Sequence, residues 1–324
     1  MRKGVALLLV LLLALGLTGC AGKQNTEKDG SSIVVGFSQL GAESSWRIAN
    51  TASMEQAAKD FGYGLMMENA NQKQEKQIDA IRSFIAYHVD VIVFSPIVET
   101  GWDNVLAEAK QAGIPVILMD RMIDTEDDSL YTTYVGADFL AEGRRAGEYL
   151  VRKADALGKK QVRVVEICGT ENSTPMRDRQ RGFLDVISRD SRFTVIDSVD
   201  GDFLRSKGEE CMRELLKKYG PDGFDVVYSH NDAMTLGALD VLESTESIPE
   251  DLILITVDGE KEAVDALKAG RINCVVQCTP NLGISVMRLV KELTEGRTVL
   301  KAYFPEEDVF TDFDELTDPR VEGF

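Results

Sequence analysis

Apolar and polar positions alternate along most of the chain in one repeating pattern, in which short apolar runs are separated by longer amphipathic stretches. The runs Ile33–Phe37, Val89–Phe94 and Ile114–Met119 are almost continuously apolar, which is typical of strands buried on both faces. Between the first two, Trp46–Phe61 has apolar residues at helical spacing, and Gly62 follows where a helix is expected to end. The pattern predicts strands and helices in alternation, and therefore parallel sheets.

The alternation begins again halfway along the chain, which predicts two doubly wound α/β lobes, each a parallel sheet covered by helices on both faces. The other elements expected in the first half are strands at 64–67 and 133–135 and helices at 74–87 and 102–111. Those expected in the second half are strands at 162–167, 193–199, 226–229, 252–257, 272–277 and 299–304, and helices at 140–152, 176–188, 207–218, 234–243, 262–269 and 282–293.

Side chains that can form hydrogen bonds follow nearly every predicted strand. The carboxyl ends of parallel strands meet at one edge of a sheet, which is where open α/β sheets bind their ligands. The segments at these ends are Phe37–Gln39, Asn69–Gln72, Ser95, Asp120-Arg121, Gly169-Thr170, Asp200–Phe203, His230–Asp232, Asp258 and Gln277. We therefore expect a polar site to which both halves contribute.

The residue types at these ends suit a sugar, which offers hydroxyl groups and apolar C–H faces. The candidates for hydrogen bonds to hydroxyls are Asp120, Arg121, Asn231 and Asp258. The candidates for covering C–H faces are Phe37, Trp46 and Phe203. Taken singly, the acids fit helix N-caps as well as they fit ligand contacts, and the aromatic residues alone fit a core.

Residues 1–19 have the order of a secretory signal peptide, with Arg2 and Lys3 before the apolar run Val5–Leu17. That run is shorter than the ~20 apolar residues of a spanning helix. Leu17–Cys20 resembles the bacterial lipobox, which implies that Cys20 is lipidated and becomes the mature N-terminus on the outer face of the cytoplasmic membrane. A plain secretory signal with an incidental cysteine is the alternative. Residues 20–32 are small and polar and are expected to form a flexible tether.

Composition limits the classes of partner. The net charge is −18 at pH 7, which disfavours nucleic acid, whose phosphates require basic patches. After the N-terminal run there is no second apolar stretch of membrane length, so we expect a soluble body. About 290 residues remain for it, which favours two domains.

Four cysteines lie beyond Cys20, at positions 168, 211, 274 and 278. Outside the membrane they have three possible pairings. We expect buried free thiols instead, because a chain of this length needs no disulfides to fold.

Nine segments resemble the galactofuranose-binding branch of the ribose-binding-protein superfamily, over about residues 33–303. They are Val35–Gln39, Ser45–Arg47, Gln72–Glu75, Gly101-Trp102, Leu118–Arg121, Gly201–Gly208, His230–Asp232, Val257–Gly259 and Thr279–Asn281. The resemblance implies a type I periplasmic-binding-protein fold, in which three strands join two lobes that close around a monosaccharide. It implies lobes at 33–137 plus 279–303 and at 138–278 plus 304–324.

The resemblance also implies a set of ligand contacts and partners. The implied sugar-binding residues are Phe37, Trp46, Arg47, Gln72, Asp120, Arg121, Arg177, Phe203, Asn231, Asp258 and Gln277. Whether Arg177 or Arg179 reaches the ligand stays open, and both Arg177 and Gln277 depart towards the ribose-like pattern. The expected partners are an ABC permease and its ATP-binding subunits, the protein being monomeric and without a cofactor.

Other functions fit the sequence less well. Asp120 and Asp258 imitate the carboxylate pair of a glycosidase, but ligand binding already explains both, so we expect no enzyme. The chain has no nucleophile elbow and no Walker loop, and its two histidines exclude a histidine-rich metal site. A sugar-responsive repressor would need a DNA-binding module, which nothing here resembles. A sensory lipoprotein that presents its sugar to a membrane kinase or chemoreceptor remains an alternative to transport.

Overall fold

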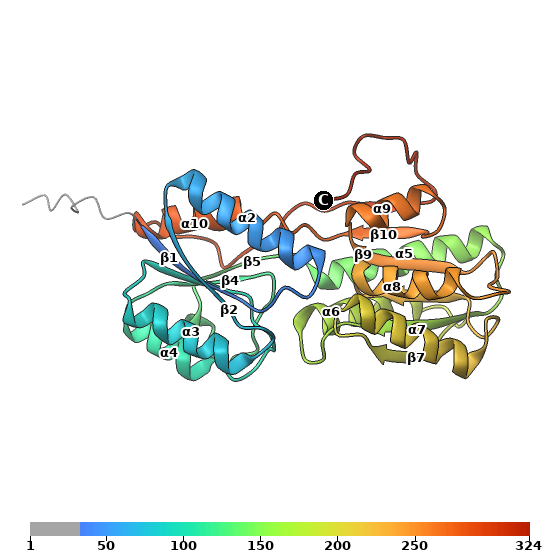
Figure 1. The fold of residues 1–324 in the computed structure, drawn as a ribbon, viewed down its shortest axis with the longest axis horizontal. Helices are drawn as coiled ribbons and strands as arrows, with labels where there is room; N and C mark the ends of the chain where they lie inside the picture. Colours follow the sequence, from blue (N-terminus) through green and yellow to red (C-terminus); the bar gives the residue numbers. More distant parts are fainter. Residues whose placement is uncertain (1–32) are drawn as a thin grey trace, which may run out of the picture. The chain divides into compact units, whose positions relative to one another are not determined.

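The computed structural model describes residues 33–324, and these contain the two α/β lobes that the sequence predicts (Figure 1). The predicted signal peptide, Cys20 and the tether lie outside the described residues. No helix among residues 33–324 combines the length and the apolar character that crossing a membrane requires.

The first sheet is parallel throughout, with the strand order β11-β5-β4-β3-β1-β2. Its strands are β1 (Val34–Gln39), β2 (Gly64–Asn69), β3 (Val91–Phe94), β4 (Val116–Met119), β5 (Thr133–Val135) and β11 (Ala302–Tyr303). The order reverses between β1 and β3, so the carboxyl ends of these strands border the crevice where a doubly wound sheet binds ligand.

The second sheet repeats this order as β12-β10-β9-β8-β6-β7. Its strands are β6 (Val162–Cys168), β7 (Phe193–Asp200), β8 (Val226–Ser229), β9 (Ile253–Asp258), β10 (Cys274–Gln277) and β12 (Val309–Thr311). The edge strand β12, which the sequence pattern did not predict, pairs antiparallel with β10. Its three residues are too few to show a period of two.

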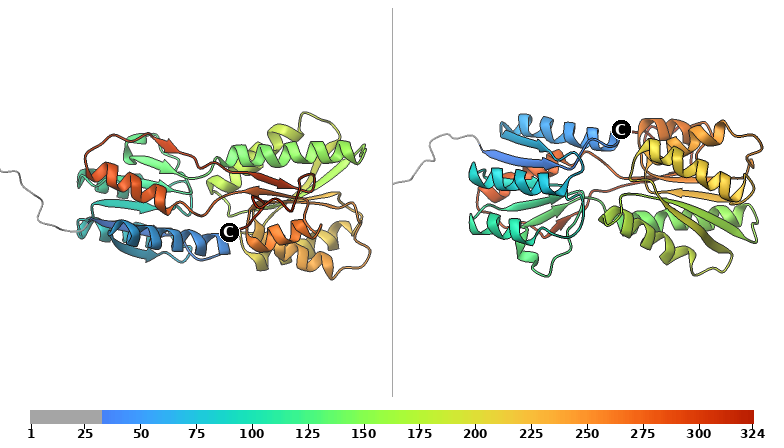
Figure 2. Two further views of the ribbon diagram at one scale, coloured as in Figure 1. Left: turned by 90° about the horizontal axis from the view of Figure 1, so that it is seen from above. Right: turned by 60° about the horizontal axis from the view of Figure 1, so that its bottom comes forward.

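Helices cover both faces of each sheet (Figure 2). In the first lobe α2 (Ser45–Phe61) and α10 (Gly283–Thr294) cover one face, and α3 (Gln74–Ala86) and α4 (Asp103–Gln111) cover the other. In the second lobe α5 (Phe139–Ala156) and α6 (Thr174–Ile187) lie opposite α7 (Arg205–Tyr219), α8 (Asp232–Glu243) and α9 (Lys261–Lys268). A short 3-10 helix, η1 (Asp128–Leu130), precedes β5.

Helix α2 shows how local sequence sets an element that carries site residues. The Ser44 side chain caps the helix by accepting from the backbone amide of Arg47. Gly62 ends it with a φ of 71°, the left-handed geometry that glycine adopts without a steric penalty. Between these ends Met54, Ala57 and Ala58 are buried against the first sheet. The helix therefore presents its first turn, with Trp46 and Arg47, at the carboxyl edge of that sheet.

The chain crosses between the two sheets three times, after β5, after β10 and after β11. The lobe limits expected at 137/138, 278/279 and 303/304 fall within these crossings, and we propose them as the domain boundaries. The first and third crossings lead from the first lobe to the second, and the middle crossing leads back to the first.

The four cysteines of the described residues are all buried and free, as predicted. Burial raises the pKa of each of these thiols above its ordinary value. Cys211, Cys274 and Cys278 pack within the hydrophobic clusters of the second lobe, and Cys278, in the middle crossing, also lines a pocket.

Candidate functional site

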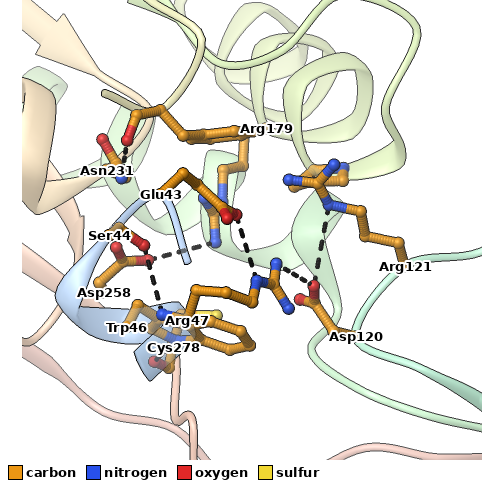
Figure 3. A pocket seen from close by; sticks show the side chains of 12 residues that line it. Glu43, Ser44, Trp46, Arg47, Asp120, Arg121, Arg179, Asn231, Asp258 and Cys278 are labelled. Carbon is orange, nitrogen blue, oxygen red and sulfur yellow. Dashed lines mark hydrogen bonds and ion pairs between the residues drawn. The ribbon is translucent and has the colours of Figure 1, made fainter. Parts of the chain in front are cut away.

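A small pocket of about 30 Å³ lies between the carboxyl edges of the two sheets (Figure 3). The first lobe contributes six of its lining residues, all near the start of α2 or the end of β4. The complete lining is Glu43, Ser44, Trp46, Arg47, Asp120, Arg121, Pro175, Arg179, Phe203, Asn231, Asp258 and Cys278. Three arginines and three acids face each other there, so the formal charges of the lining cancel.

An ion-pair network holds the first-lobe side of the pocket. The Arg47 guanidinium donates to Asp120 Oδ2 over 2.7 Å and to Glu43 Oε1 over 3.2 Å, and Ser95 donates to the same Asp120 oxygen over 3.1 Å. Burial lowers the pKa of Arg47, but the two carboxylates more than offset this and hold the pKa above its ordinary value. Arg47 is therefore a fixed cation in the wall of the pocket.

Asp120 and Arg121 follow β4 in a strained turn. Asp120 has a φ of 66°, unusual for a residue with a side chain, and its carbonyl accepts from the Tyr134 hydroxyl over 2.8 Å. Arg121 donates to the carbonyl of Ile97 over 3.1 Å, while its Nε has no hydrogen-bond partner among the described residues. Burial, together with repulsion from Arg47, lowers the pKa of Arg121 to about 10. This Nε lies 3.8 Å from Asp120 Oδ2, an ion pair without a hydrogen bond, and a buried donor of this kind is expected to face a ligand acceptor.

Arg179 holds the second-lobe side. This guanidinium donates to Glu142 Oε2 over 2.7 Å and to the carbonyl of His230 over 2.6 Å, and it lies 3.8 Å from Asp258 Oδ1. Burial raises the pKa of Asp258 well above its ordinary value, although Arg179 acts in the opposite direction. Asp258 has a φ of 130°, so strained acids end a strand on both sides of the pocket.

Asn231 and Asp232 connect the pocket to the core of the second lobe. Asn231 caps α8 by accepting from the amide of Met234, and its side-chain nitrogen donates to the carbonyl of Phe203 over 3.3 Å. Asp232 accepts from the amides of Gly259 and Glu260 over 2.7 and 2.6 Å, which fixes the turn that carries Asp258. Burial, with repulsion from Glu260, raises the pKa of Asp232 to about 8.

Two aromatic rings complete the lining. The Phe203 ring packs directly on Gly169, where an added Cβ would lie 1.8 Å from the ring, so glycine is required for this approach. The Arg121 guanidinium lies 5.4 Å from the centre of the Phe203 ring, a cation–π contact from one lobe to the other. Trp46 is buried among second-lobe residues and donates from Nε1 to the carbonyl of Cys278 over 2.7 Å.

Further contacts join the lobes beside the pocket. The exposed Arg177 pairs with Glu99, whose amide donates to the carbonyl of Asn172 over 3.1 Å. The amide of Met122 donates to the Thr174 hydroxyl over 3.1 Å. The lobes therefore touch around the pocket and limit its access to water.

The structure brings together seven of the eleven predicted site residues. They are Trp46, Arg47, Asp120, Arg121, Phe203, Asn231 and Asp258. Their proposed ligand contacts remain predictions, but their positions fit a site built from both lobes.

The other four predicted residues do not line this pocket. Phe37 is fully buried in the first-lobe core, because β1 continues two residues beyond it. Gln72 is exposed on a turn after β2, with a φ of 62°. Gln277 bonds to the third crossing, since its Oε1 accepts from the amide of Asp308. Arg177 lies on the exposed face of α6, so the geometry favours Arg179 in the pocket.

Sequence reasoning missed four lining residues: Glu43, Ser44, Pro175 and Cys278. The Ser44 cap was the available signal, since it fixes the start of α2 and thereby brings Glu43 beside Arg47. Glu43 is informative because its Oε2 is buried without a hydrogen-bond partner among the described residues. With the Arg121 Nε it gives the pocket one free acceptor and one free donor, which suits a neutral ligand with hydroxyl groups.

Comparison with known proteins agrees with this geometry. Residues 35–298 match the family model described as periplasmic binding protein domain. The chain is 41% identical over 252 residues to the galactofuranose-binding protein YtfQ of Escherichia coli, covering 77% of this chain and 78% of that protein.

Solved structures give the same result. A Mycobacterium smegmatis protein in complex with β-D-fucofuranose is 43% identical, with a TM-score of 0.83 and coverage of 87% of this chain and 92% of that one. The binding component of the arabinose ABC transporter of Shewanella sp. ANA-3, bound to L-arabinofuranose, is 38% identical, with a TM-score of 0.82 and coverage of 86% and 91%. The fructose-binding periplasmic domain of the hybrid two-component system BT1754 is 26% identical, with a TM-score of 0.78 and coverage of 87% and 91%.

The two arginines of α6 give a matched test of which one contacts the ligand. We expect Arg179→Lys to weaken binding at least tenfold, because lysine cannot reproduce the planar fork between Glu142 and the pocket. Arg177→Lys should change affinity less than about threefold, since exposed ion pairs contribute little. Calorimetric titration with the furanoses bound by the relatives measures both. Equal losses in the two variants would contradict the assignment.

Asp232 predicts a pH dependence of stability. Its folded pKa of about 8 lies above the ordinary 3.8, so between these values the folded state binds more protons than the unfolded state. The free energy of unfolding therefore falls as pH rises from 6 to 8, by at most about 1.4 kcal/mol per pH unit from this group. Asp232→Asn keeps an oxygen that accepts from the two amides, and in place of the oxygen that accepts from the Thr256 hydroxyl it offers an NH2 group that can donate to that hydroxyl; the variant should flatten the slope. Denaturant unfolding at both pH values measures it, and an unchanged slope would contradict the assignment.

Proposed function

Because the chain belongs to the periplasmic binding protein domain family, we propose that it is an extracytoplasmic solute-binding lipoprotein that captures a monosaccharide between two lobes and delivers it to an ABC importer. The observation that carries the proposal is the pocket lining, in which buried arginines, acids and aromatic rings come from both lobes. Neither lobe alone has the full set, so ligand binding and lobe closure depend on each other.

The lining favours a neutral polyhydroxy ligand over a charged one. Its three arginines are balanced by three acids, and an additional ligand charge would lack a buried counter-charge. The rings of Trp46 and Phe203 supply apolar surface for C–H faces. We therefore propose a sugar whose hydroxyls bridge the two lobes.

A furanose is the form of sugar that we propose. Furanoses are the named ligands of the galactofuranose-binding protein and of the two most similar solved relatives described above. A galactofuranose-like ligand is our first choice and a ribose-like ligand the second, because Gln277 departs from the galactofuranose pattern. In this chain Gln277 holds Asp308 of the third crossing, so its influence would act on the hinge more than on the ligand.

We propose binding without catalysis. A glycosidase would require one of the two pocket acids to donate a proton while the other attacks. Asp120 is unsuited to either step, because it is already bonded to Arg47 and Ser95. The acids instead orient donors towards a ligand.

Delivery to an importer is supported by the relative that belongs to an arabinose ABC transporter. The alternative function is that of a sensory lipoprotein, which is favoured by the similarity to the periplasmic domain of a two-component system. Both functions use the same two-lobed clamp. A neighbouring permease gene would favour transport, and a neighbouring sensor-kinase gene would favour sensing.

A thermal-shift screen over furanose and pyranose sugars tests the proposal. A ligand that binds only the folded state adds about 2.7 kcal/mol to the free energy of unfolding when present at 100 times its Kd. The melting temperature rises as a result. We expect a shift with one or a few furanoses and no turnover of the sugar or its glycosides. No shift with any sugar, or product formation, would overturn the proposal.

Two pocket variants connect the shift to the proposed residues. Asp120→Asn keeps the size of the side chain, and Asn231→Ser keeps a residue that can cap α8. Each variant loses hydrogen-bonding capacity towards the ligand, which should cost ~1–3 kcal/mol of binding free energy. Asp128→Asn, an exposed first-lobe site, is the matched control. Wild-type affinity in both pocket variants would place the sugar elsewhere.

The lipid anchor has its own test. We propose that residues 1–19 are removed and that Cys20 is acylated, since two acyl chains hold a protein at a membrane where one does not. We expect fatty-acid labelling and membrane fractionation to place the wild type in the membrane and Cys20→Ala in the soluble fraction, with Cys211→Ala as control. Unlabelled wild-type protein would contradict the anchor.

A further inference from the structure

Glu142, Cys278 and Glu307 form a cluster at the junction of the lobes, and it shares Cys278 with the lining of the pocket. A carboxylate oxygen of each acid and the thiol sulfur lie within 4.8 Å of one another. The three residues come from different segments: Glu142 from α5, Cys278 from the middle crossing and Glu307 from the third crossing. Their convergence therefore depends on how the second lobe meets its connections.

Each of the two acids is held in place through one of its carboxylate oxygens. Glu142 Oε2 accepts from Arg179 over 2.7 Å, while its Oε1 is buried with no hydrogen-bond partner among residues 33–324. Glu307 Oε1 accepts from the amide of Thr279 over 2.9 Å. Outer contacts of this kind are what orient ligands around a metal ion.

The buried, unpartnered oxygen of Glu142 requires an explanation, because such a group normally costs free energy. Its side chain is completely buried, and Arg179 reaches only its other oxygen. Two carboxylates and a thiol thus share a largely buried space, with Glu142 Oε1 unpartnered in it among the described residues. The cluster therefore favours a positively charged occupant.

We propose that Glu142, Cys278 and Glu307 bind one divalent transition-metal ion, with zinc as the first choice. A thiolate selects soft or borderline ions over calcium and magnesium, and two carboxylates with one thiolate leave a fourth position of a tetrahedral site for water. The Cys278 thiol gives up its proton to solvent when it coordinates. Glu307 is only half-buried, which provides the entry path.

A second cluster, Glu166, Cys168 and His230, lacks this feature. Glu166 Oε1 contacts His230 Nε2 over 3.0 Å, and its Oε2 accepts from Gln180 and Ser198 over 2.8 and 2.7 Å. Both carboxylate oxygens are satisfied, so this group is a complete hydrogen-bond network. The contrast identifies the Glu142 cluster as the one open to an ion.

Titration of the full chain with Cd²⁺ tests the proposal, because a cadmium–thiolate bond gives an ultraviolet charge-transfer absorption. A Cys20→Ala background removes the thiol outside the described residues. We expect one equivalent of Cd²⁺ to produce the band and Zn²⁺ to displace it. Cys278→Ser should abolish the band, and Glu307→Gln should weaken Cd²⁺ binding at least tenfold.

The matched controls are Cys274→Ser at the start of β10, four residues before Cys278, and Cys168→Ser in the second cluster, both of which should keep the band. Melting temperatures identify any variant that fails to fold. If Cys278→Ser fails to fold, Glu307→Gln decides the outcome, because Glu307 is only half-buried and its replacement should leave the fold intact. No band in the wild type, an unchanged affinity in Glu307→Gln, or loss of the band only in Cys168→Ser would overturn the proposal. Sugar affinity is measured separately, so this result is independent of the proposed function.

Discussion

The buried ion pair between Arg47 and Asp120 is the interaction on which the pocket depends. Both side chains are nearly inaccessible, and their 2.7 Å contact joins the first turn of α2 to the end of β4. Desolvating two charges is expensive, and the cost is recovered only with close geometry and further hydrogen bonds. Glu43 and Ser95 supply those bonds on the first-lobe side. Arg179, Glu142 and the His230 carbonyl repeat the arrangement on the other side. Each half of the lining is therefore held in position by contacts within its own lobe, which lowers the entropic cost of binding.

The strained acids at the strand ends belong to the same design. Asp120 and Asp258 each have a positive φ, which costs of order 1–3 kcal/mol and persists only where surrounding contacts impose it. Tyr134 fixes the first turn, and Asp232 fixes the second through the amides of Gly259 and Glu260. The folded structure thus stabilises two carboxylates in positions that they would not adopt in a free loop.

Most of the fold and much of the pocket follow from the sequence, for identifiable reasons. Continuous β-branched runs predict buried parallel strands, and the ends of those strands predict Asp120, Asn231 and Asp258 at one edge.

Side-chain direction is harder to predict. Residues two apart on a helix face nearly opposite sides, so α6 directs Arg179 inward and leaves Arg177 outside. Phe37 lies in the first-lobe core and does not line the pocket, and this could not be foreseen because the extent of β1 cannot be read from apolarity alone. The cluster of Glu142, Cys278 and Glu307 contains no histidine, so counting histidines could not reveal it. Its members are 136 and 29 positions apart in the sequence, so no short motif marks it either.

The bond from Trp46 to the carbonyl of Cys278 has an optical consequence. The chain has two tryptophans, and the other, Trp102, is buried in the first-lobe core with its indole bonded to Val98. Separation of the lobes would take the Trp46 indole away from the Cys278 carbonyl, whereas the Arg47 cation, 4.6 Å from its ring on the same helix, would move with it, and Trp102 would stay as it is. The protein thus contains its own fluorophore for the opening motion, with a second, unresponsive one as an internal standard.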